Sequence, residues 1–237
     1  MWNMRVSFED VNKNEILKYL SYRGSEIPRE IDELIDKSIE AVIEKSSFLY
    51  TYREYKLERF EKNGEEKLFL GGSTFELEGN DIKNLLSECE ICVVFAATLG
   101  VEIDRYVRSM QVRDFAQSII LDSCASSIIE SFCNILNKEL ELKYKSDKLY
   151  LTDRFSPGYG DMPIESQKKL CDVMELPKKI GVNVSSSGIM IPRKSVTAII
   201  GISKEKQSKR FSGCENCRIF KSCIYRKNGK LCKNTIE

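Results

Sequence analysis

The sequence contains no histidine among its 237 residues, and this absence excludes several kinds of chemistry. Histidine is the usual general base beside serine and cysteine nucleophiles, and imidazole is the commonest side-chain ligand of protein metals. Catalytic triads of the Ser-His-Asp kind, Cys-His pairs and metal sites that need imidazole are therefore excluded. The chemistry of this chain must use other groups.

Net charge and long apolar runs are also missing. The chain has 37 basic and 36 acidic residues, a formal net charge of +1, so its charge favours neither nucleic acid nor a membrane as the main partner. No apolar run approaches the roughly 20 residues that a membrane-spanning helix needs. Residues 1–6 lead directly into charged sequence without the apolar stretch of a signal peptide. We therefore expect one substantial cytoplasmic domain.

Cysteine is abundant by contrast. Nine cysteines, an odd number, are present, and structural disulfides are not expected in a reducing cytoplasm. Five of the nine lie in apolar patterns or flank the start of a strand, so we predict that they are small core residues. These five are Cys89, Cys92, Cys124, Cys133 and Cys171.

The periodicity of apolar residues predicts an α+β fold. The expected helices cover residues 8–20, a segment beginning near Pro28, a short segment capped by Asp81 and ending near Cys89, a long or kinked segment over 102–145, and 164–174. The expected strands cover residues 48–57, 67–70, 75–77, 91–97, 179–185 and 189–203, with a hairpin turn at Asn63-Gly64. Because the strands are joined by hairpins and the helices come in blocks, the sheet should be mostly antiparallel.

The long helical segment carries two patterns. Its apolar stripe comprises Phe115, Ile119, Ile128, Phe132, Ile135 and Leu136. Polar residues recur at every fourth position, and we call this series the polar row: Asp114, Ser118, Asp122, Ser126 and Glu130. Such a row could form a polar wall for the amino group of a ligand, but a solvated helix face is the interpretation that we favour from the pattern.

The segment Arg154-Phe155-Ser156-Pro157-Gly158-Tyr159, here called the Arg-Gly-Tyr motif, is the most informative stretch. An arginine can hold a carboxylate with two parallel hydrogen bonds, and a glycine lets backbone approach a ligand closely. Tyr159 adds a flat face and one hydroxyl. This layout suits a small zwitterionic ligand with a planar ring. On the residues alone, however, an ordinary Ser-Pro-Gly turn between a strand and a helix is the favoured interpretation.

A second segment, Met190-Ile191-Pro192-Arg193-Lys194-Ser195-Val196, follows the motif about thirty residues later. Together the two segments resemble the S-adenosylmethionine-binding activation domain of cobalamin-dependent methionine synthase, over roughly residues 148–203. Pro163 also fits the proline that follows the motif in the family. Ile164 and Glu165 depart from the family's Asp-His pair, and the Ala198-Ile199-Ile200 strand lacks its aromatic residues.

The resemblance implies a curved antiparallel sheet flanked by helices and an accessory role in reactivation. A stand-alone activation subunit would bind S-adenosylmethionine and support reductive methylation of the corrinoid carried by methionine synthase or another corrinoid protein. Flavodoxin or ferredoxin would be a suitable electron donor. Arg154 would pair with the methionyl carboxylate, the backbone of Ser156 and Gly158 would line the ligand, and Tyr159 would pack against it or hydrogen-bond to it. Cobalamin would belong to the partner, since this chain has no histidine to bind cobalt.

The last part of the chain carries a separate signal, Cys214, Cys217, Cys223 and Cys232. Four thiolates at this spacing suit zinc or an iron–sulfur cluster, and we lean toward the cluster. The alternatives are an iron–sulfur redox activator of a corrinoid methyltransferase, a zinc-stapled interaction module, or free thiols. We expect a ligand-binding domain over residues 1–203, a linker over 204–213 and a cysteine-rich tail over 214–237.

Overall fold

Strand β3 (Cys89–Thr98) is the centre of the sheet, as its apolar sequence predicts. The computed structural model describes residues 4–22, 24 and 26–207. Strand β3 pairs antiparallel with β1 (Leu49–Lys62) on one side and β7 (Ser195–Ser203) on the other. The five-stranded order is β2-β1-β3-β7-β4, with β2 at Glu65–Leu70 and β4 at Tyr150–Leu151, and every pairing is antiparallel.

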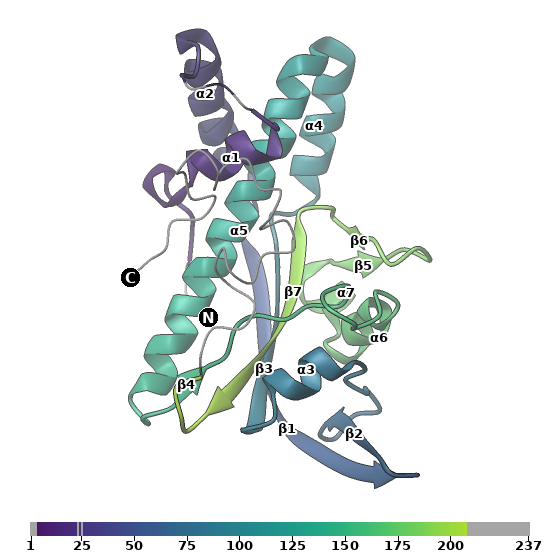
Figure 1. Cartoon of the computed structure of the whole chain (residues 1–237). Helices are drawn as coiled ribbons and strands as arrows, with labels where there is room; N and C mark the ends of the chain where they lie inside the picture. The colour runs from purple at the N-terminus through teal and green to yellow at the C-terminus, as the bar shows by residue number, and fades with distance from the viewer. Residues whose placement is uncertain (1–3, 23, 25, 208–237) are drawn as a thin grey trace.

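Helices cover both faces of this sheet (Figure 1). They are the 3-10 helix η1 (Phe8–Asp10), α1 (Lys13–Tyr19), α2 (Arg29–Lys45), α3 (Asn80–Leu85), α4 (Val101–Arg113), α5 (Phe115–Lys145), α6 (Ser166–Val173) and α7 (Leu176–Ile180). A small second sheet pairs β5 (Asn183–Val184) with β6 (Met190–Ile191). The predicted α+β fold, an antiparallel sheet flanked by helices, is confirmed.

Alternate residues of β3 belong to two separate cores. Val93 and Phe95 pack with α2, α4 and α5, whereas Cys92 and Val94 pack with α3, α6 and α7. Because successive side chains of a strand point to opposite faces, a strand buried on both sides must be apolar throughout. This is why the run over residues 91–97 has no alternation.

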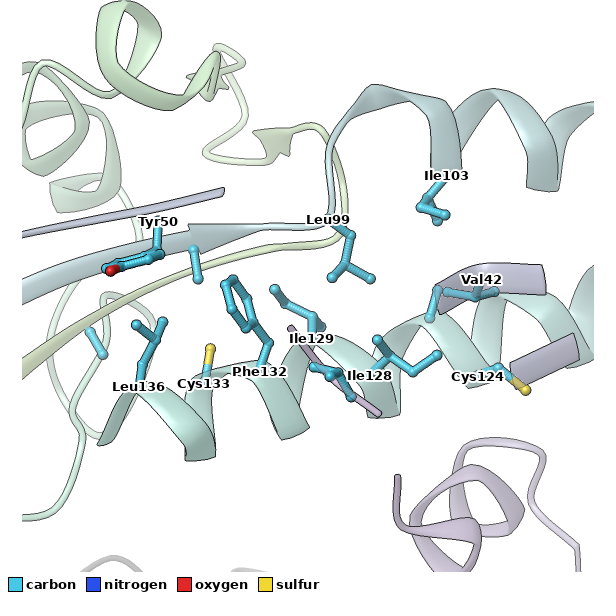
Figure 2. Packing of buried hydrophobic residues seen from close by; sticks show 14 of the residues in the cluster. Val42, Tyr50, Leu99, Ile103, Cys124, Ile128, Ile129, Phe132, Cys133 and Leu136 are labelled. Atoms are coloured by element: carbon cyan, nitrogen blue, oxygen red, sulfur yellow. The ribbon is translucent and has the colours of Figure 1, made fainter. Parts of the chain in front are cut away.

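Helix α5 contributes many of the buried residues of the larger core. Phe132 is fully buried and lies beside Tyr50 in the larger core (Figure 2). It meets the rings of Phe48 and Tyr50 edge to face, at centroid distances of 5.2 and 6.2 Å. Burying a phenylalanine of this kind contributes about 1.5–3 kcal/mol relative to leaving it exposed. By length and composition α5 could span a membrane, but 67% of its most apolar window is buried inside the protein, which accounts for its composition.

The predicted apolar stripe of this helix is only partly correct. Ile128, Phe132 and Leu136 are buried, but Phe115 and Ile119 are 67% and 45% exposed. The first turns of α5 extend with α4 beyond the end of the sheet, so no strand of residues 4–207 that the structure describes lies beneath them (Figure 1). The predicted kink is a break at Asp114, whose carboxylate accepts a hydrogen bond from the Gln117 amide at 3.0 Å and caps α5.

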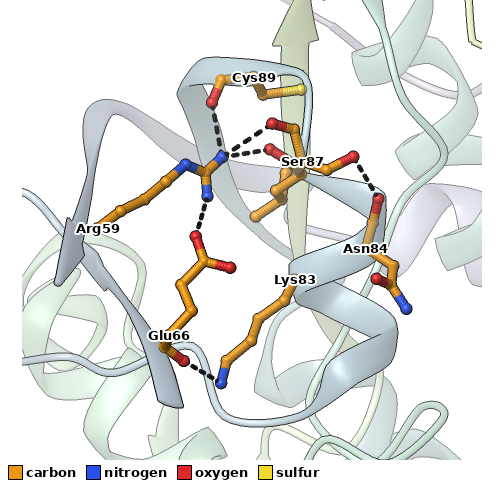
Figure 3. A network of polar contacts seen from close by, with 7 residues as sticks. Arg59, Glu66, Lys83, Asn84, Ser87 and Cys89 are labelled. Carbon is orange, nitrogen blue, oxygen red and sulfur yellow. Dashed lines mark hydrogen bonds and ion pairs between the residues drawn. The ribbon is translucent and has the colours of Figure 1, made fainter. Parts of the chain in front are cut away.

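The hairpin predicted at Asn63-Gly64 is confirmed. Both residues have positive φ, +55° and +80°, and Lys62 pairs directly with Glu65, which is the geometry of a two-residue turn. Arg59 of β1 then reaches past the end of α3. Its Nη2 donates to the carbonyls of Leu86, Ser87 and Cys89 at 2.7, 3.3 and 3.0 Å, and so fixes the hairpin against α3 (Figure 3).

Helix α3 is capped differently from the prediction. Asp81 was expected to be its N-cap, but the N-cap is Gly79 and the capping carboxylate belongs to Asp161, far along the chain. The amides of Asn80 and Asp81 donate to Asp161 at 2.7 and 3.0 Å. These bonds hold the start of α3 against the loop that follows the Arg-Gly-Tyr motif.

Three further predictions need correction. Residues 8–20 form η1 and α1 rather than one helix. Residues 75–77 make only an isolated bridge, Phe69 with Glu76. The strand predicted over 179–185 is α7 followed by the two-residue strand β5, because Pro177 lies in the first turn of α7 and Gly181 ends it at φ +69°.

Candidate functional site

The Arg-Gly-Tyr motif lies beside the sheet because its backbone pairs with β7. The amide of Phe155 donates to the carbonyl of Ile199 at 2.9 Å, and the Ile199 amide donates back at 2.7 Å. The Ser156 hydroxyl donates to the carbonyl of Thr197 at 2.6 Å. The side chain of Ser156 therefore fixes the motif to β7. If this residue contacts a ligand, its backbone is the part that is available.

The turn of the motif requires glycine at position 158. Gly158 has φ +87°, and a β-carbon added there would lie 3.1 Å from Cδ1 of Ile164. The Gly158 amide donates to the carbonyl of Met162, and the Tyr159 amide donates to that of Ser156, both at 3.0 Å. The closed loop leaves the Tyr159 side chain 59% exposed on the surface.

Arg154 turns toward α5 rather than into bulk water. Its Nη2 lies 2.9 Å from Oδ1 of Asn134 and 3.3 Å from Oε2 of Glu130, and its side chain is 22% exposed. Its other terminal nitrogen, Nη1, is buried and has no hydrogen-bond partner within the described residues. A buried donor without a partner is costly, so the hydrogen bonding of this guanidinium is incomplete.

The polar row of α5 is not the solvated face that we favoured from the sequence. Glu130 contacts Arg154, while Asp122 and Ser126 bind Lys194, whose Nζ lies 2.9 Å from Oδ1 of Asp122 and 2.8 Å from Oγ of Ser126. Ser118, earlier in the row, is buried and donates to the carbonyl of Phe115. Three members of the row therefore face cations that arrive from distant segments.

The segment that carries Lys194 is anchored at several points. The Lys194 residue is 9% exposed, and the amide of Arg193 donates to Oδ2 of Asp104 at 2.8 Å. The Ser195 hydroxyl contacts Oγ1 of Thr98 at 2.8 Å. A polar cavity of about 120 Å³ adjoins this anchor and is lined by Asp104, Val107, Arg108, Gln111, Asp122 and Arg193.

The electrostatics of the motif follow from this arrangement. The pKa of Tyr159 is raised, first by burial of its hydroxyl and then by the carboxylate of Glu130, with Arg154 acting in the opposite direction. Burial raises the pKa of the neighbouring Cys133 thiol to about 12. Both groups therefore stay protonated at neutral pH, and the acidic and basic side chains that meet at the site are those of Glu130 and Arg154.

The structure tests the predicted roles of five cysteines and leaves four untested. Cys89, Cys92, Cys124, Cys133 and Cys171 are free and buried, as predicted. Cys214, Cys217, Cys223 and Cys232 lie outside the described residues. Within residues 4–22, 24 and 26–207, no group of three or more cysteine, aspartate and glutamate side chains is arranged to hold a metal ion.

Of the predicted ligand residues, the structure brings Arg154, Ser156, Gly158 and Tyr159 into one loop beside α5. Sequence reasoning missed Asn134, and it considered Glu130 only as one member of the polar row, for which a solvated face was favoured over a wall for a ligand. The four-residue spacing of the polar row was the available signal, but a solvated face has the same spacing.

The fold and the site together define an α+β domain in which a fixed cation on a sheet-bound loop meets a carboxylate of the central helix. Residues 82–217 match the family model described as vitamin B12-dependent methionine synthase, activation domain. This match covers more than half of the 237 residues, and the chain belongs to that family.

A solved structure described as the MetH reactivation domain bound to AdoHcy has the same fold. Its TM-score with this chain is 0.63 at 13% sequence identity, and the alignment covers 97% of this chain and 86% of that one. At this identity the likeness concerns the fold alone. Comparison with curated proteins finds no match.

Proposed function

We propose that this chain binds S-adenosylmethionine at the Arg-Gly-Tyr motif and presents its methyl group to the corrinoid of a cobalamin-dependent methionine synthase, as a separate accessory subunit. Membership in the activation-domain family supports the proposal. The solved relative of the same fold is described as bound to AdoHcy, which is what S-adenosylmethionine becomes after it donates its methyl group.

The observation that carries the proposal is the incomplete pairing of Arg154. The methionyl end of S-adenosylmethionine is a zwitterion, with one carboxylate and one ammonium group. Arg154 and Glu130, 3.3 Å apart, offer one charge for each. Nη1 is buried and has no partner among the described residues, so a turn of the Arg154 side chain would be needed to bring it to a ligand carboxylate and complete the guanidinium with a charge-assisted pair. Glu130 would then be available for the ammonium group.

The remaining residues of the motif would hold the ligand rather than react with it. Gly158 allows its backbone to approach the ligand, and the exposed ring of Tyr159 offers a flat apolar face. Methyl transfer from a sulfonium moves no proton, so no acid or base is needed and the contribution of the chain is positioning. The absence of histidine is consistent with such a role.

The corrinoid belongs to the partner in this proposal. The partner's corrinoid would supply the cobalt that accepts the methyl group, and a donor such as flavodoxin or ferredoxin would supply the one electron that reactivation needs. This chain would hold S-adenosylmethionine in place and release S-adenosylhomocysteine. This chain has no histidine to bind cobalt. The partner could be methionine synthase or another corrinoid methyltransferase, and a reactivation assay with each purified partner identifies which one it serves.

Calorimetric titration with S-adenosylmethionine tests the proposal. The wild-type chain should bind it, and Arg154→Ala should lose on the order of 2–5 kcal/mol of binding free energy through loss of a charge-assisted pair. Lys194→Met is the matched control, because it removes the other cation that contacts the polar row. Absence of binding to the wild type, alone and with the corrinoid partner, would refute the proposal.

The cysteine cluster of residues 214–232 supports a separate proposal from sequence alone, a zinc or iron–sulfur site. Anaerobic purification followed by iron, sulfide and zinc analysis tests it. Iron with sulfide would support a redox role for the tail, and zinc alone a structural one. Full-length protein without either metal would refute the site.

A further inference from the structure

Asn134 extends the polar row of α5 by one position and makes the shorter of the two contacts between this helix and Arg154. Its Oδ1 accepts a hydrogen bond from Nη2 of Arg154 at 2.9 Å, whereas Oε2 of Glu130 lies 3.3 Å from the same nitrogen. Residues four apart lie on one face of a helix, so the guanidinium meets both side chains at once. Asn134 is exposed, which places its amide at the surface of the site.

The second acceptor of Arg154 is an uncharged amide, and this determines the charge of the contact. The positive charge of Arg154 is balanced by the single carboxylate of Glu130, and Asn134 adds no charge. The methionyl end of S-adenosylmethionine likewise carries one charge of each sign. A hydrogen bond from a guanidinium to an amide is also weaker than one to a carboxylate. Asn134 therefore holds the guanidinium beside α5 and leaves its charge for a ligand.

Lys13 shows the alternative arrangement in the same protein. Its Nζ lies 3.0 Å from Oδ1 of Asp32 and 2.6 Å from Oδ1 of Asp36, two carboxylates that are four residues apart on α2. These two pairs tie the start of α1 to α2. A carboxylate at position 134 would give Arg154 the same double pairing, and a ligand carboxylate would then have to compete with it.

We propose that Asn134 is a positioning residue of the ligand site, whose neutral amide holds Arg154 without neutralising it and so keeps the guanidinium able to bind the methionyl carboxylate. This inference rests on the proposed function. The turn of the Arg154 side chain that brings Nη1 to the ligand then costs at most a hydrogen bond to a neutral acceptor, rather than a second ion pair. The plainer alternative is that Asn134 only supports Arg154, in which case a carboxylate at the same position serves equally well.

Titration of two ligands separates these possibilities. S-adenosylmethionine and its decarboxylated analogue are each titrated into the full-length wild type, Asn134→Asp, Asn134→Ala and the control Asn63→Asp. The control makes the same change from amide to carboxylate at an exposed residue of the β1–β2 turn, where Asp-Gly is accepted as well as Asn-Gly. Thermal unfolding of each variant confirms that it is folded, and Asn134→Glu replaces the aspartate variant if that one does not fold.

In Asn134→Asp the preference for the carboxylate-containing ligand should fall about tenfold, because the new carboxylate competes for the guanidinium of Arg154. In Asn134→Ala it should fall by less than about threefold, since the charge of Arg154 is kept. Asn63→Asp should keep the wild-type preference. A wild-type preference in Asn134→Asp, or a fall in Asn134→Ala at least as large as in Asn134→Asp, overturns this inference and leaves the proposed function standing. Failure of the wild type to bind S-adenosylmethionine, alone and with the corrinoid partner, overturns both.

Discussion

Arg154 and Lys194 both contact the polar row of α5, but they differ in how completely they are paired. Lys194 is 9% exposed, and its ammonium meets Asp122 and Ser126. Arg154 meets Glu130 and Asn134, while its buried Nη1 has no partner within the described residues. The pairing of Lys194 is that of a structural contact, whereas in the proposed function the unpaired Nη1 of Arg154 is where a ligand would bind. Adjacent turns of α5 would then serve folding and binding separately.

The largest effect on stability is expected at Lys194. In Lys194→Met the free energy of unfolding should fall by about 2–3 kcal/mol, because the ion pair with Asp122 and the hydrogen bond that the Ser126 hydroxyl accepts from the ammonium are both lost. Urea denaturation measures this loss. The affinity of the folded variant for S-adenosylmethionine should stay within about threefold of the wild type. A variant as stable as the wild type would remove the contrast with Arg154.

Substitutions of Glu130 and Asp122, the carboxylates that contact Arg154 and Lys194, test the same contrast between binding and stability. Glu130→Gln should lower affinity for S-adenosylmethionine about tenfold, since a charge-assisted contact with the ligand ammonium becomes a neutral one. Its stability should change by less than about 1 kcal/mol, because the pair with Arg154 is partly exposed. Asp122→Asn is the control and should affect stability more than affinity. The reverse pattern would contradict the division of roles.

A smaller effect is expected at Asp161, which caps α3 from the loop after the motif. Asp161→Ala should cost about 1 kcal/mol of stability at pH 7, the usual value of an N-cap. The two amide hydrogen bonds lower the pKa of Asp161 below its ordinary 3.8. Its contribution is therefore fully present above that ordinary value and is lost as the pH falls through the lowered pKa.

Urea denaturation at pH 7 and in strong acid measures this prediction. The difference between the wild type and Asp161→Ala should shrink as the pH falls below about 4. Asp147→Ala, at an exposed aspartate in the turn after α5, is the control and should show no such change. A difference that is constant with pH would mean that the cap does not act through the charged carboxylate.

The elements that the sequence predicts well are those that depend on neighbouring residues. The apolar run of β3 reports burial on both faces, and Asn63-Gly64 supplies the positive φ angles of a tight hairpin. Helix α7 was missed although its signals were present. Pro177 and Gly181 mark its two ends, but the alternating apolar residues around Val182 were interpreted as a strand.

The site depends on contacts between distant segments, which a local pattern does not contain. The cap of α3 comes from Asp161, 80 residues beyond the amide of Asp81, and Arg154 is 24 residues beyond Glu130. Periodicity favoured a solvated face for the polar row, and residue composition favoured a simple turn for the motif. The family resemblance, rather than the chemistry of the residues, directed attention to Arg154 and Tyr159.

The central claim is that Arg154 binds the methionyl carboxylate of S-adenosylmethionine. Titrating S-adenosylmethionine and its decarboxylated analogue into the wild type and Arg154→Ala tests this claim most directly. The wild type should bind the carboxylate-containing ligand at least tenfold more tightly, while Arg154→Ala should bind the two with nearly equal affinity. If Arg154→Ala keeps the full preference of the wild type, the carboxylate is bound elsewhere and the account is wrong.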